Sequence, residues 1–302
     1  MNKHIIFVVS LIIALFIIVA GCRGGKQSDQ KTLSGTSGFV IKDVGFKTPE
    51  SVIHDTANDI YLVSNINGDP LAEDDNGFIS QINPDGKVIN LKWIDGSSKG
   101  IALNAPKGLA ITDDKLFVAD ITTVRVFDRI SGNPVKDITI PGATFLNGLA
   151  AGKNSSIFVT DSGLPEANDA VYKITADFQV ELIAKNAELN RPNGIIQCKE
   201  GKLLVVSFGG NELYKLDYEG VRDILFLSPT SGLDGLVELN DGRLAFSSWE
   251  GSAVYTYDKI GEIATLIDNV KSPAGIGYDS RRNLILIPLF YNNSIVVKSA
   301  EA

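Results

Sequence analysis

Apolar and polar positions alternate along most of the chain, in short runs that end at Asp, Asn or Gly. Alternation of this kind, bounded by turn residues, predicts half-buried β-strands joined by tight hairpins. The clearest unit holds runs at Gly108–Thr112, Lys115–Ala119, Val124–Asp128 and Val135–Ile140. After Phe39 no stretch longer than a turn has the spacing of an amphipathic helix. The pattern therefore predicts an all-β fold.

This unit recurs six times, and each copy starts with the same short phrase. The phrase consists of Pro or Leu, one variable residue, and then usually Gly and an apolar run. Successive copies start 40 to 57 residues apart, and a period of ~40–50 residues is typical of arrays and propellers. Four antiparallel strands repeated six times predict a six-bladed β-propeller. The six copies stand at Pro49-Glu50-Ser51, Pro106-Lys107-Gly108, Leu146-Asn147-Gly148, Pro192-Asn193-Gly194, Leu233-Asp234-Gly235 and Pro273-Ala274-Gly275.

The last copy of the unit is one strand short. It supplies runs at Gly275–Tyr278, Leu284–Leu289 and Ser294–Lys298, whereas Phe39–Gly45 is a spare strand before the first copy. We expect the spare strand to pair with Ser294–Lys298 and to close the ring without an open edge. The alternative is that Phe39–Gly45 is only an edge extension.

The first 22 residues stand apart from the propeller pattern. Positions 5–20 are apolar apart from Ser10, a run that is short for a membrane span and close to a signal sequence. The run ends in Val19-Ala20-Gly21-Cys22, which resembles a bacterial lipoprotein signal. The resemblance implies a leader cut before Cys22, a lipid on that cysteine, and a protein anchored to a bacterial membrane on its extracytoplasmic side. The alternatives are an uncleaved anchor helix and an ordinary secretory leader.

The stretch that follows the leader is rich in Gly, Ser, Lys, Gln and Thr and has almost no apolar side chains. Such a composition cannot bury surface, so it predicts a flexible tether. We therefore expect three segments: a signal peptide at 1–22, a linker at 23–38 and a propeller at 39–302.

The variable residue of the repeated phrase carries the candidate chemistry. It precedes each innermost strand, so the six copies should ring the central channel at one mouth, where the following Gly lets the backbones crowd the axis. Two carboxylates and two amides in this phase form an all-oxygen set with formal charge −2, which suits a hard divalent ion, best Ca²⁺. The alternative is that these are ordinary Asn-Gly and Asp-Gly turn pairs. The candidate metal ligands are Glu50, Asn147, Asn193 and Asp234.

The phrases around Asn193 and Asp234, in repeats of this length, resemble the SMP-30/gluconolactonase family of six-bladed propellers. The likeness runs from about Phe39 to the end, and the wider superfamily includes lactonases, paraoxonase-like esterases and organophosphate hydrolases. It implies a catalytic divalent ion, calcium or another, on the four ligands named above. It also implies that Asp234 acts as base or nucleophile. The repeats also resemble NHL-type propellers, which are usually binding scaffolds without the metal.

Lys107 is the one cation among the variable residues, and we regard it as a second catalytic candidate. It is placed to hold a substrate carboxylate or a developing oxyanion. The alternative is that Lys107 forms a salt bridge with Asp120 or Glu50.

The loops between the second and third strands should open at the same mouth as the variable residues. Trp249 and Tyr291 are candidates to wall an apolar substrate, and the alternative for each loop residue is ordinary packing. The substrate-binding candidates are Asp161, Ser207, Trp249 and Tyr291, and Asn65, Asp120 and Ser247 should share the mouth with them.

Composition narrows the function further. The net charge is −8 and no basic run follows residue 31, so nucleic acid is not an expected partner. His4 and His54 are the only histidines, too few for a His-based zinc site or a Ser-His-Asp triad. We expect His54 to serve in packing. With Cys22 assigned to lipid, Cys198 is expected to be a lone buried thiol.

Two functions fit these observations. The first is a metal-dependent hydrolase of lactones, esters or related phosphoesters, a membrane-tethered monomer that acts on a small molecule. The second is a non-catalytic NHL-like propeller that binds a ligand or a protein at the cell surface. The oxygen ligands in phase favour the hydrolase, because a pure scaffold has no need of them. A structural calcium ion would use the same oxygens.

Overall fold

The computed structural model describes residues 38–165, 168–198 and 200–301. The predicted signal at 1–22 with its lipidated Cys22, and the linker up to residue 37, lie outside the described residues. In the described part, no helix has the length and apolar character to cross a membrane. The described helices are three single 3₁₀ turns, and the rest of the regular structure is strand, which confirms the all-β prediction. The turns are η1 (Lys153–Ser155), η2 (Ala187–Leu189) and η3 (Phe290–Asn292).

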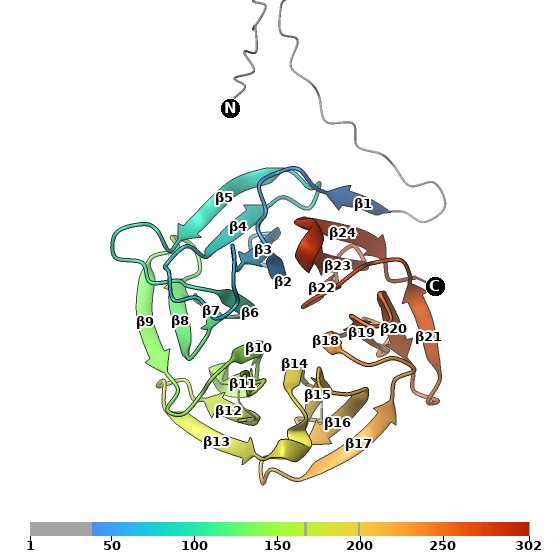
Figure 1. Ribbon diagram of the computed structural model, residues 1–302. Coiled ribbons are helices and arrows are strands. Elements are labelled where there is room, and N and C mark those ends of the chain that lie inside the picture. Colours follow the sequence, from blue (N-terminus) through green and yellow to red (C-terminus); the bar gives the residue numbers. More distant parts are fainter. Residues whose placement is uncertain (1–37, 166–167, 199, 302) are drawn as a thin grey trace, which may run out of the picture. The chain divides into compact units, whose positions relative to one another are not determined.

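Six antiparallel sheets of four strands stand around a central axis, which confirms the six-bladed propeller (Figure 1). Blade one holds β2 (Pro49–Asp55), β3 (Ile60–Asn65), β4 (Phe78–Ile82) and β5 (Val88–Asp95), and blade two holds β6 (Pro106–Thr112), β7 (Lys115–Asp120), β8 (Thr123–Asp128) and β9 (Pro134–Thr139). Blade three holds β10 (Leu146–Ala151), β11 (Ile157–Asp161), β12 (Ala170–Ile174) and β13 (Val180–Lys185). Blade four holds β14 (Pro192–Gln197), β15 (Leu203–Ser207), β16 (Glu212–Leu216) and β17 (Arg222–Leu227). Blade five holds β18 (Leu233–Glu238), β19 (Leu244–Ser248), β20 (Ala253–Tyr257) and β21 (Ile263–Ile267). Blade six holds β22 (Gly277–Asp279), β23 (Leu284–Leu289), β24 (Ser294–Ser299) and, from the other end of the chain, β1 (Gly38–Ile41).

The ring is closed by the strand that precedes blade one. β1 pairs antiparallel with β24, from Gly38 opposite Lys298 to Ile41 opposite Ile295. The predicted pairing of the spare strand with Ser294–Lys298 is therefore confirmed, although the strand ends at Ile41 and not at Gly45. The strand stops there because Asp43 and Gly45 have positive φ angles of 59° and 104°, which turn the chain away from the sheet.

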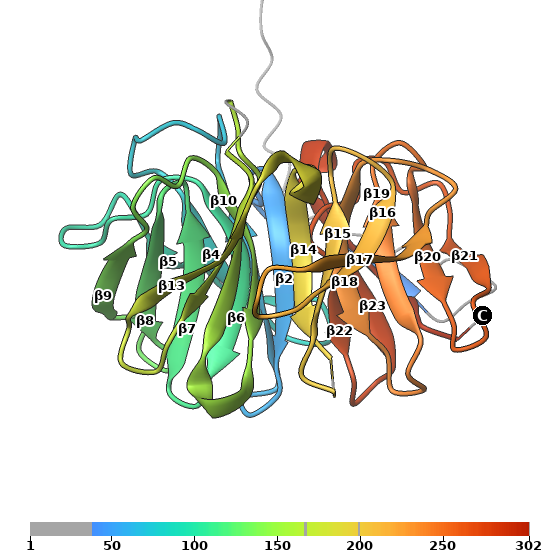
Figure 2. The ribbon, with the colours of Figure 1, turned by 90° about the horizontal axis from the view of Figure 1, so that it is seen from below.

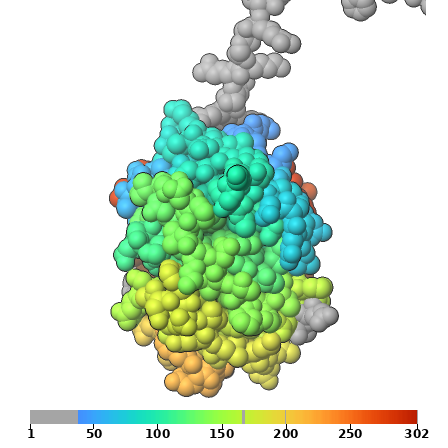
Figure 3. All heavy atoms as spheres, turned by 90° about the vertical axis from the view of Figure 1, so that its left-hand side faces the viewer, coloured from blue at the N-terminus to red at the C-terminus, as the bar shows by residue number. Residues whose placement is uncertain are grey.

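Burial falls from the second strand of a blade to its outer edge. All residues of β11 are buried, whereas β9 is exposed at every position except Ile138. Apolar side chains from facing blades meet in shared clusters, one of which joins Phe117 and Val126 of blade two to Tyr172 of blade three. Figure 2 shows the blades edge-on, with β2, β14 and β18 along the axis. Figure 3 shows one side of the molecule, where the surface changes from blue-green through green and yellow to orange, so that neighbouring blades follow one another in sequence order.

Polar contacts tie blade one to blade six beneath the ring closure. The imidazole of His54 is buried, with Nε2 3.0 Å from Asp59 Oδ1 and Nδ1 3.4 Å from Asp279 Oδ1. Tyr61 donates its hydroxyl hydrogen to the same Asp279 at 2.8 Å. His54 thus serves the packing between blades, as the sequence predicted. Cys198 is a free thiol, half-buried where a buried one was expected.

Candidate metal centre

Each candidate ligand stands at a β-bulge at the start of an innermost strand. In β10 the pairing with β11 jumps from Leu146 to Leu149, so that Asn147 lies in the extra loop of the bulge. The same break occurs in β6, β14 and β18, and in β2 a shorter one lies between Pro49 and Ser51, on either side of Glu50. A bulge bends its strand and re-aims a side chain out of the alternating pattern. The repeated phrase is therefore a device that turns one side chain per blade out of the sheet.

Glycine follows Asn147, Asn193 and Asp234, although not Glu50, because neighbouring inner strands nearly touch there. A Cβ on Gly148 would lie 2.2 Å from the carbonyl oxygen of Asn193, and one on Gly194 would lie 2.4 Å from that of Asp234. No side chain fits at such distances, so the crowding predicted at the axis is present. Blades two, three and four thus each place this glycine against the carbonyl of the next blade's candidate ligand.

Hydroxyl groups of the second strands lock these neighbours together. Thr160 Oγ1 accepts a hydrogen bond from the Gly148 amide at 2.8 Å and donates to the Asn193 carbonyl at 2.7 Å. Ser247 makes the matching bridge from the Gly235 amide to the Ala274 carbonyl, at 2.7 Å and 2.9 Å. Sequence reasoning placed Ser247 at the mouth and missed Thr160. The sequence did contain a signal for it: a hydroxyl residue stands at the same position of the second strand in alternate blades.

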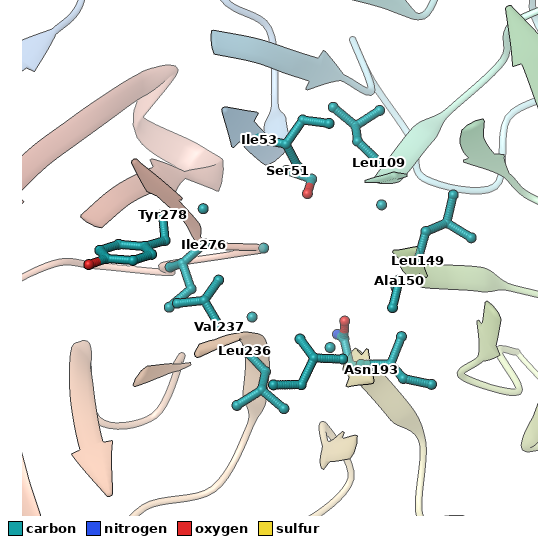
Figure 4. A pocket seen from close by; sticks show the side chains of 18 of the residues that line it. Ser51, Ile53, Leu109, Leu149, Ala150, Asn193, Leu236, Val237, Ile276 and Tyr278 are labelled. Carbon is teal, nitrogen blue, oxygen red and sulfur yellow. The ribbon is translucent and has the colours of Figure 1, made fainter. Parts of the chain in front are cut away.

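The four candidate ligands converge on one cavity. Glu50, Asn147, Asn193 and Asp234 line the same central space of about 460 Å³, and their exposed fractions lie between 3% and 6%. Figure 4 shows the side-chain amide of Asn193 among the side chains around this space. Four of the six repeat positions, far apart in the sequence, are thus brought together at one cavity.

Asp234 is the most constrained of the four. Its Oδ2 accepts a hydrogen bond from Trp249 Nε1 at 2.8 Å, whereas its buried Oδ1 has no hydrogen-bond partner among the described residues. Burial raises the pKa of Asp234 well above its usual range, and the charge of Glu50 raises it further, while hydrogen bonding from the side chains of Trp249 and Asn193 opposes the shift. Burial likewise raises the pKa of Glu50 to about 7, although the nearby ammonium of Lys107 opposes the shift.

These residues fit a hard divalent cation. When Glu50, Asp234 and Lys107 are ionised, one negative charge in a buried ring is uncompensated, and burial of an unpaired charge is costly. The orphaned oxygen of Asp234 lacks a partner that a cation would supply. Among the described residues no three His, Cys, Asp or Glu side chains cluster as a metal site, so the amides of Asn147 and Asn193 must complete the donor set. Calcium accepts such carbonyl oxygens readily.

Asn147 is held in an orientation that suits this role. Its Nδ2 donates to Ser162 Oγ at 3.2 Å, and that hydroxyl donates in turn to the Pro192 carbonyl at 2.8 Å. With the amide nitrogen anchored, the amide oxygen is the atom left for a ligand. Ser162 was missed by sequence reasoning, because it follows the second strand of blade three without any repeat signal.

Lys107 does not make the ion pair that the sequence suggested. Its ammonium donates to the carbonyls of Pro70 and Ala105, both at 2.9 Å, and lies 4.4 Å from the ring centre of Phe145. The predicted partner Asp120 binds Arg125 Nε at 2.9 Å instead. Burial lowers the pKa of Lys107 to about 8, while the charge of Glu50 opposes that shift. The Lys107 side chain does not line the central cavity, so it acts on the candidate ligands through its charge, chiefly on Glu50.

Two of the predicted substrate-binding residues, Asp161 and Ser207, form hydrogen bonds with the backbone of neighbouring loops. Asp161 is fully buried, and its carboxylate accepts the backbone amides of Thr144 and Phe145 at 2.9 Å and 2.8 Å. Ser207 donates its hydroxyl hydrogen to the Asn190 carbonyl at 2.5 Å. Both residues end a second strand and clasp the loop that leads into their own blade's innermost strand. This geometry corrects the substrate-binding role predicted for them; Asn65 and Asp120 make the same kind of clasp.

A cluster of aromatic side chains lies beside the candidate ligands, on the side where these loops are. Trp249 contacts Phe290 and Tyr291 with ring centres 5.2 Å and 5.8 Å apart, and Phe208 lies 5.5 Å from it on another side. The predicted neighbours Trp249 and Tyr291 thus do meet, and Tyr291 is 71% exposed. The bond from Trp249 to Asp234 was missed, as were Phe208 and Phe290. A sequence pattern carries no sign of which polar atom an indole will reach.

No protein-family model and no curated protein matches this chain in sequence. The fold matches a gluconolactonase from Xanthomonas campestris with a TM-score of 0.68 and 17% identity, over 88% of this chain and 90% of that one. It also matches regucalcin, a calcium-binding protein from Agrobacterium tumefaciens, with a TM-score of 0.64 and 17% identity, over 87% and 93%. Virginiamycin B lyase from Staphylococcus aureus gives a TM-score of 0.60 and 16% identity, over 83% and 94%. All are six-bladed propellers, and at these identities the likeness shows the fold alone.

Proposed function

We propose that this chain is a divalent-metal-dependent hydrolase of lactones, esters or related phosphoesters, with calcium as the best-fitting ion. The observation that carries the proposal is Asp234, a buried carboxylate with one oxygen fixed by Trp249 and the other without a partner. An unpaired buried acceptor costs about 1–3 kcal/mol. Asp169 also has an unpaired buried oxygen, but Asp234 differs from it in lining the central cavity beside Glu50. Strong pKa perturbation beside a cavity is also a mark of functional carboxylates.

The ring residues divide the work between them. Glu50, Asn147, Asn193 and Asp234 would hold the ion, which supplies Lewis-acid polarisation of the substrate's carbonyl or phosphoryl oxygen. The bond from Trp249 keeps Oδ2 of Asp234 in place and leaves Oδ1 to take a proton from an attacking water, or to attack the carbonyl itself. Either role requires an ionised Asp234, and the repulsion between it and Glu50 makes that state dependent on a nearby cation.

The histidine content favours hydrolysis over the reaction of the lyase neighbour. A variant of virginiamycin B lyase with a histidine replaced by alanine is described as catalytically inactive. In the part of this chain that the structure describes, the one histidine is His54, and its imidazole lies between Asp59 and Asp279 at the blade seam. His54 also lines the central cavity, but both of its ring nitrogens lie against these carboxylates, which favours hydrolysis over a histidine-dependent elimination.

We also propose that the protein is held at a bacterial membrane, on its extracytoplasmic side, by a lipid on Cys22. The support is the sequence Val19-Ala20-Gly21-Cys22 after an apolar run. A gluconolactonase-like propeller at that place would meet small-molecule substrates outside the cytoplasm.

The test is a panel of lactones, carboxylic esters and phosphoesters, assayed with calcium and with chelator. Asp234→Asn keeps the size and one oxygen of the side chain, so calcium binding should survive in part while turnover falls by orders of magnitude. Asp268→Asn, on an exposed loop, is the matched control. Full activity in chelator, or an Asp234→Asn variant as active as the parent, would remove the hydrolase proposal and leave the binding scaffold in its place.

A further inference from the structure

The central cavity reaches well beyond the ring of candidate ligands. It is lined at one end by Glu50 and Asp234, where innermost strands begin, and at the other by Gln197 and Ser280, near the places where such strands end. It therefore follows the axis of the propeller along the length of the inner strands. Sequence reasoning looked for the substrate only on the opposite side of the ring, among the loops between second and third strands.

The loop side of the ring is covered by apolar packing. Phe290 packs against a buried cluster of Ile66, Ala105 and Ile121, which follow or precede strands of blades one and two. Trp249 adds its ring to Phe290 and its Nε1–H to Asp234. These contacts lie over the starts of the inner strands and help to explain why the candidate ligands are nearly inaccessible there. The open volume that touches the ligands lies on the channel side.

The wall of this channel is aliphatic directly beneath the polar ring. The residue two positions after the variable one lines the cavity in five blades, and it is always Leu or Ile. Ile53 of blade one lines the cavity at nearly the same phase. Figure 4 shows several of these side chains around the open centre. The aliphatic wall residues are Ile53, Leu109, Leu149, Ile195, Leu236 and Ile276.

We propose that this channel binds an unbranched alkyl chain of the substrate, with the chain's polar group at the ring of candidate ligands. The inference rests on the proposed function and narrows its substrate class to lactones or esters that carry a linear alkyl chain. A polyhydroxylated sugar lactone suits the aliphatic wall poorly, because its hydroxyl groups would lose water there without gaining hydrogen bonds. Polar side chains line the far end of the channel, among them Gln197, Glu238 and Ser280. A chain with one polar end matches a tube with a polar ring above an aliphatic wall.

The dimensions set the length of chain that fits. β14 advances ~13 Å from Asn193 to Gln197, at about 3.3 Å per residue, and both residues line the cavity. An extended alkyl chain with C–C bonds of about 1.5 Å advances ~1.3 Å per carbon, so roughly ten carbons span the channel. The cavity volume of about 460 Å³ falls within the usual range for small-molecule sites. Affinity should rise about fourfold for each buried methylene until the channel is filled.

The experiment titrates the full-length protein calorimetrically with butanol, hexanol and octanol, in chelator, so that no metal and no turnover is needed. Ala151→Trp places a large side chain at the far end of the channel, where Ala151 is exposed and lines the cavity. Ala264→Trp makes the same change at an exposed position of the outermost strand β21. We expect affinity to rise about fourfold per methylene in the parent and in Ala264→Trp, and to stay nearly constant in Ala151→Trp.

Two results would overturn the inference: octanol binding no tighter than butanol, or octanol binding Ala151→Trp as tightly as the parent. A parallel series of γ-butyrolactone, γ-octalactone and γ-decalactone with calcium tests turnover. If the alcohols bind as expected and no lactone is hydrolysed, the channel site stands and the hydrolase proposal fails. If short lactones are hydrolysed and chain length changes neither binding nor kcat/KM, the hydrolase proposal stands and the channel site fails.

Discussion

Replacing Trp249 with phenylalanine would test the centre most sharply, because it removes the indole N–H and keeps an aromatic ring in place. A smaller ring remains to pack against Phe290 and Phe208, but Asp234 Oδ2 loses its 2.8 Å bond from Nε1. A hydrogen bond to a charged group is worth about 1.5–3 kcal/mol, so its loss should raise the pKa of Asp234 still further.

Calcium affinity should fall about 10–100-fold in the Trp249→Phe variant at neutral pH, as is usual when a group that orients a metal ligand is lost. The sign of the pH dependence follows from the raised pKa. A protonated Asp234 must lose its proton before a cation binds, so a higher pKa moves the onset of binding to higher pH. Calorimetric calcium titrations at neutral and alkaline pH should show a deficit that shrinks as the pH rises.

Trp93→Phe is the matched control, because Trp93 is the chain's other tryptophan and is half-buried on the outer strand β5. It should leave calcium affinity unchanged. Equal affinity and an equal pH profile for Trp249→Phe and the parent would refute the reasoning, since the bond to Asp234 would then have no bearing on a metal. An equal loss in both variants would point to a general effect on the fold.

Four further predictions concern the pH dependence of stability, the role of Lys107, the closure of the propeller and the lipid anchor on Cys22. Burial raises the pKa of folded Glu50 to about 7 from an ordinary value of 4.5, so without metal the free energy of unfolding should fall by ~3 kcal/mol as the pH rises between those values. Glu50→Gln should flatten that slope in urea titrations. Lys107→Met should lower Tm and reduce turnover of acidic and neutral esters alike, whereas a loss confined to acidic esters would show that Lys107 contacts the substrate. Deleting residues 39–45 removes the strand that pairs with β24 and should cause aggregation, while deleting residues 26–37 should leave Tm unchanged. Cys22→Ser should abolish lipid labelling and membrane retention, and a variant that still sediments with membranes would indicate an anchor helix.

The sequence alone determined the ring and the meeting of the candidate ligands. Alternating apolar positions specify strands, and a repeat of near-constant length places equivalent residues at equivalent positions around an axis. Glu50 and Asp234 are therefore neighbours in space because they share a phase, whatever their side chains do. The closing strand could also be predicted from the sequence, because an incomplete last blade needs a strand and the spare first strand needs a partner.

The tertiary structure alone decided what each polar atom does. Asp161 and Lys107 stand at repeat positions as regular as those of the ligands, yet one clasps a loop and the other donates to the carbonyls of Pro70 and Ala105. The bond from Trp249 to Asp234 joins two residues of one blade through a particular rotamer and bulge. Spacing along a chain fixes where a backbone passes, but hydrogen-bond partners depend on side-chain directions set by packing between blades. The open side of the ring was decided at the same level, because it depends on how loops from different blades pack together.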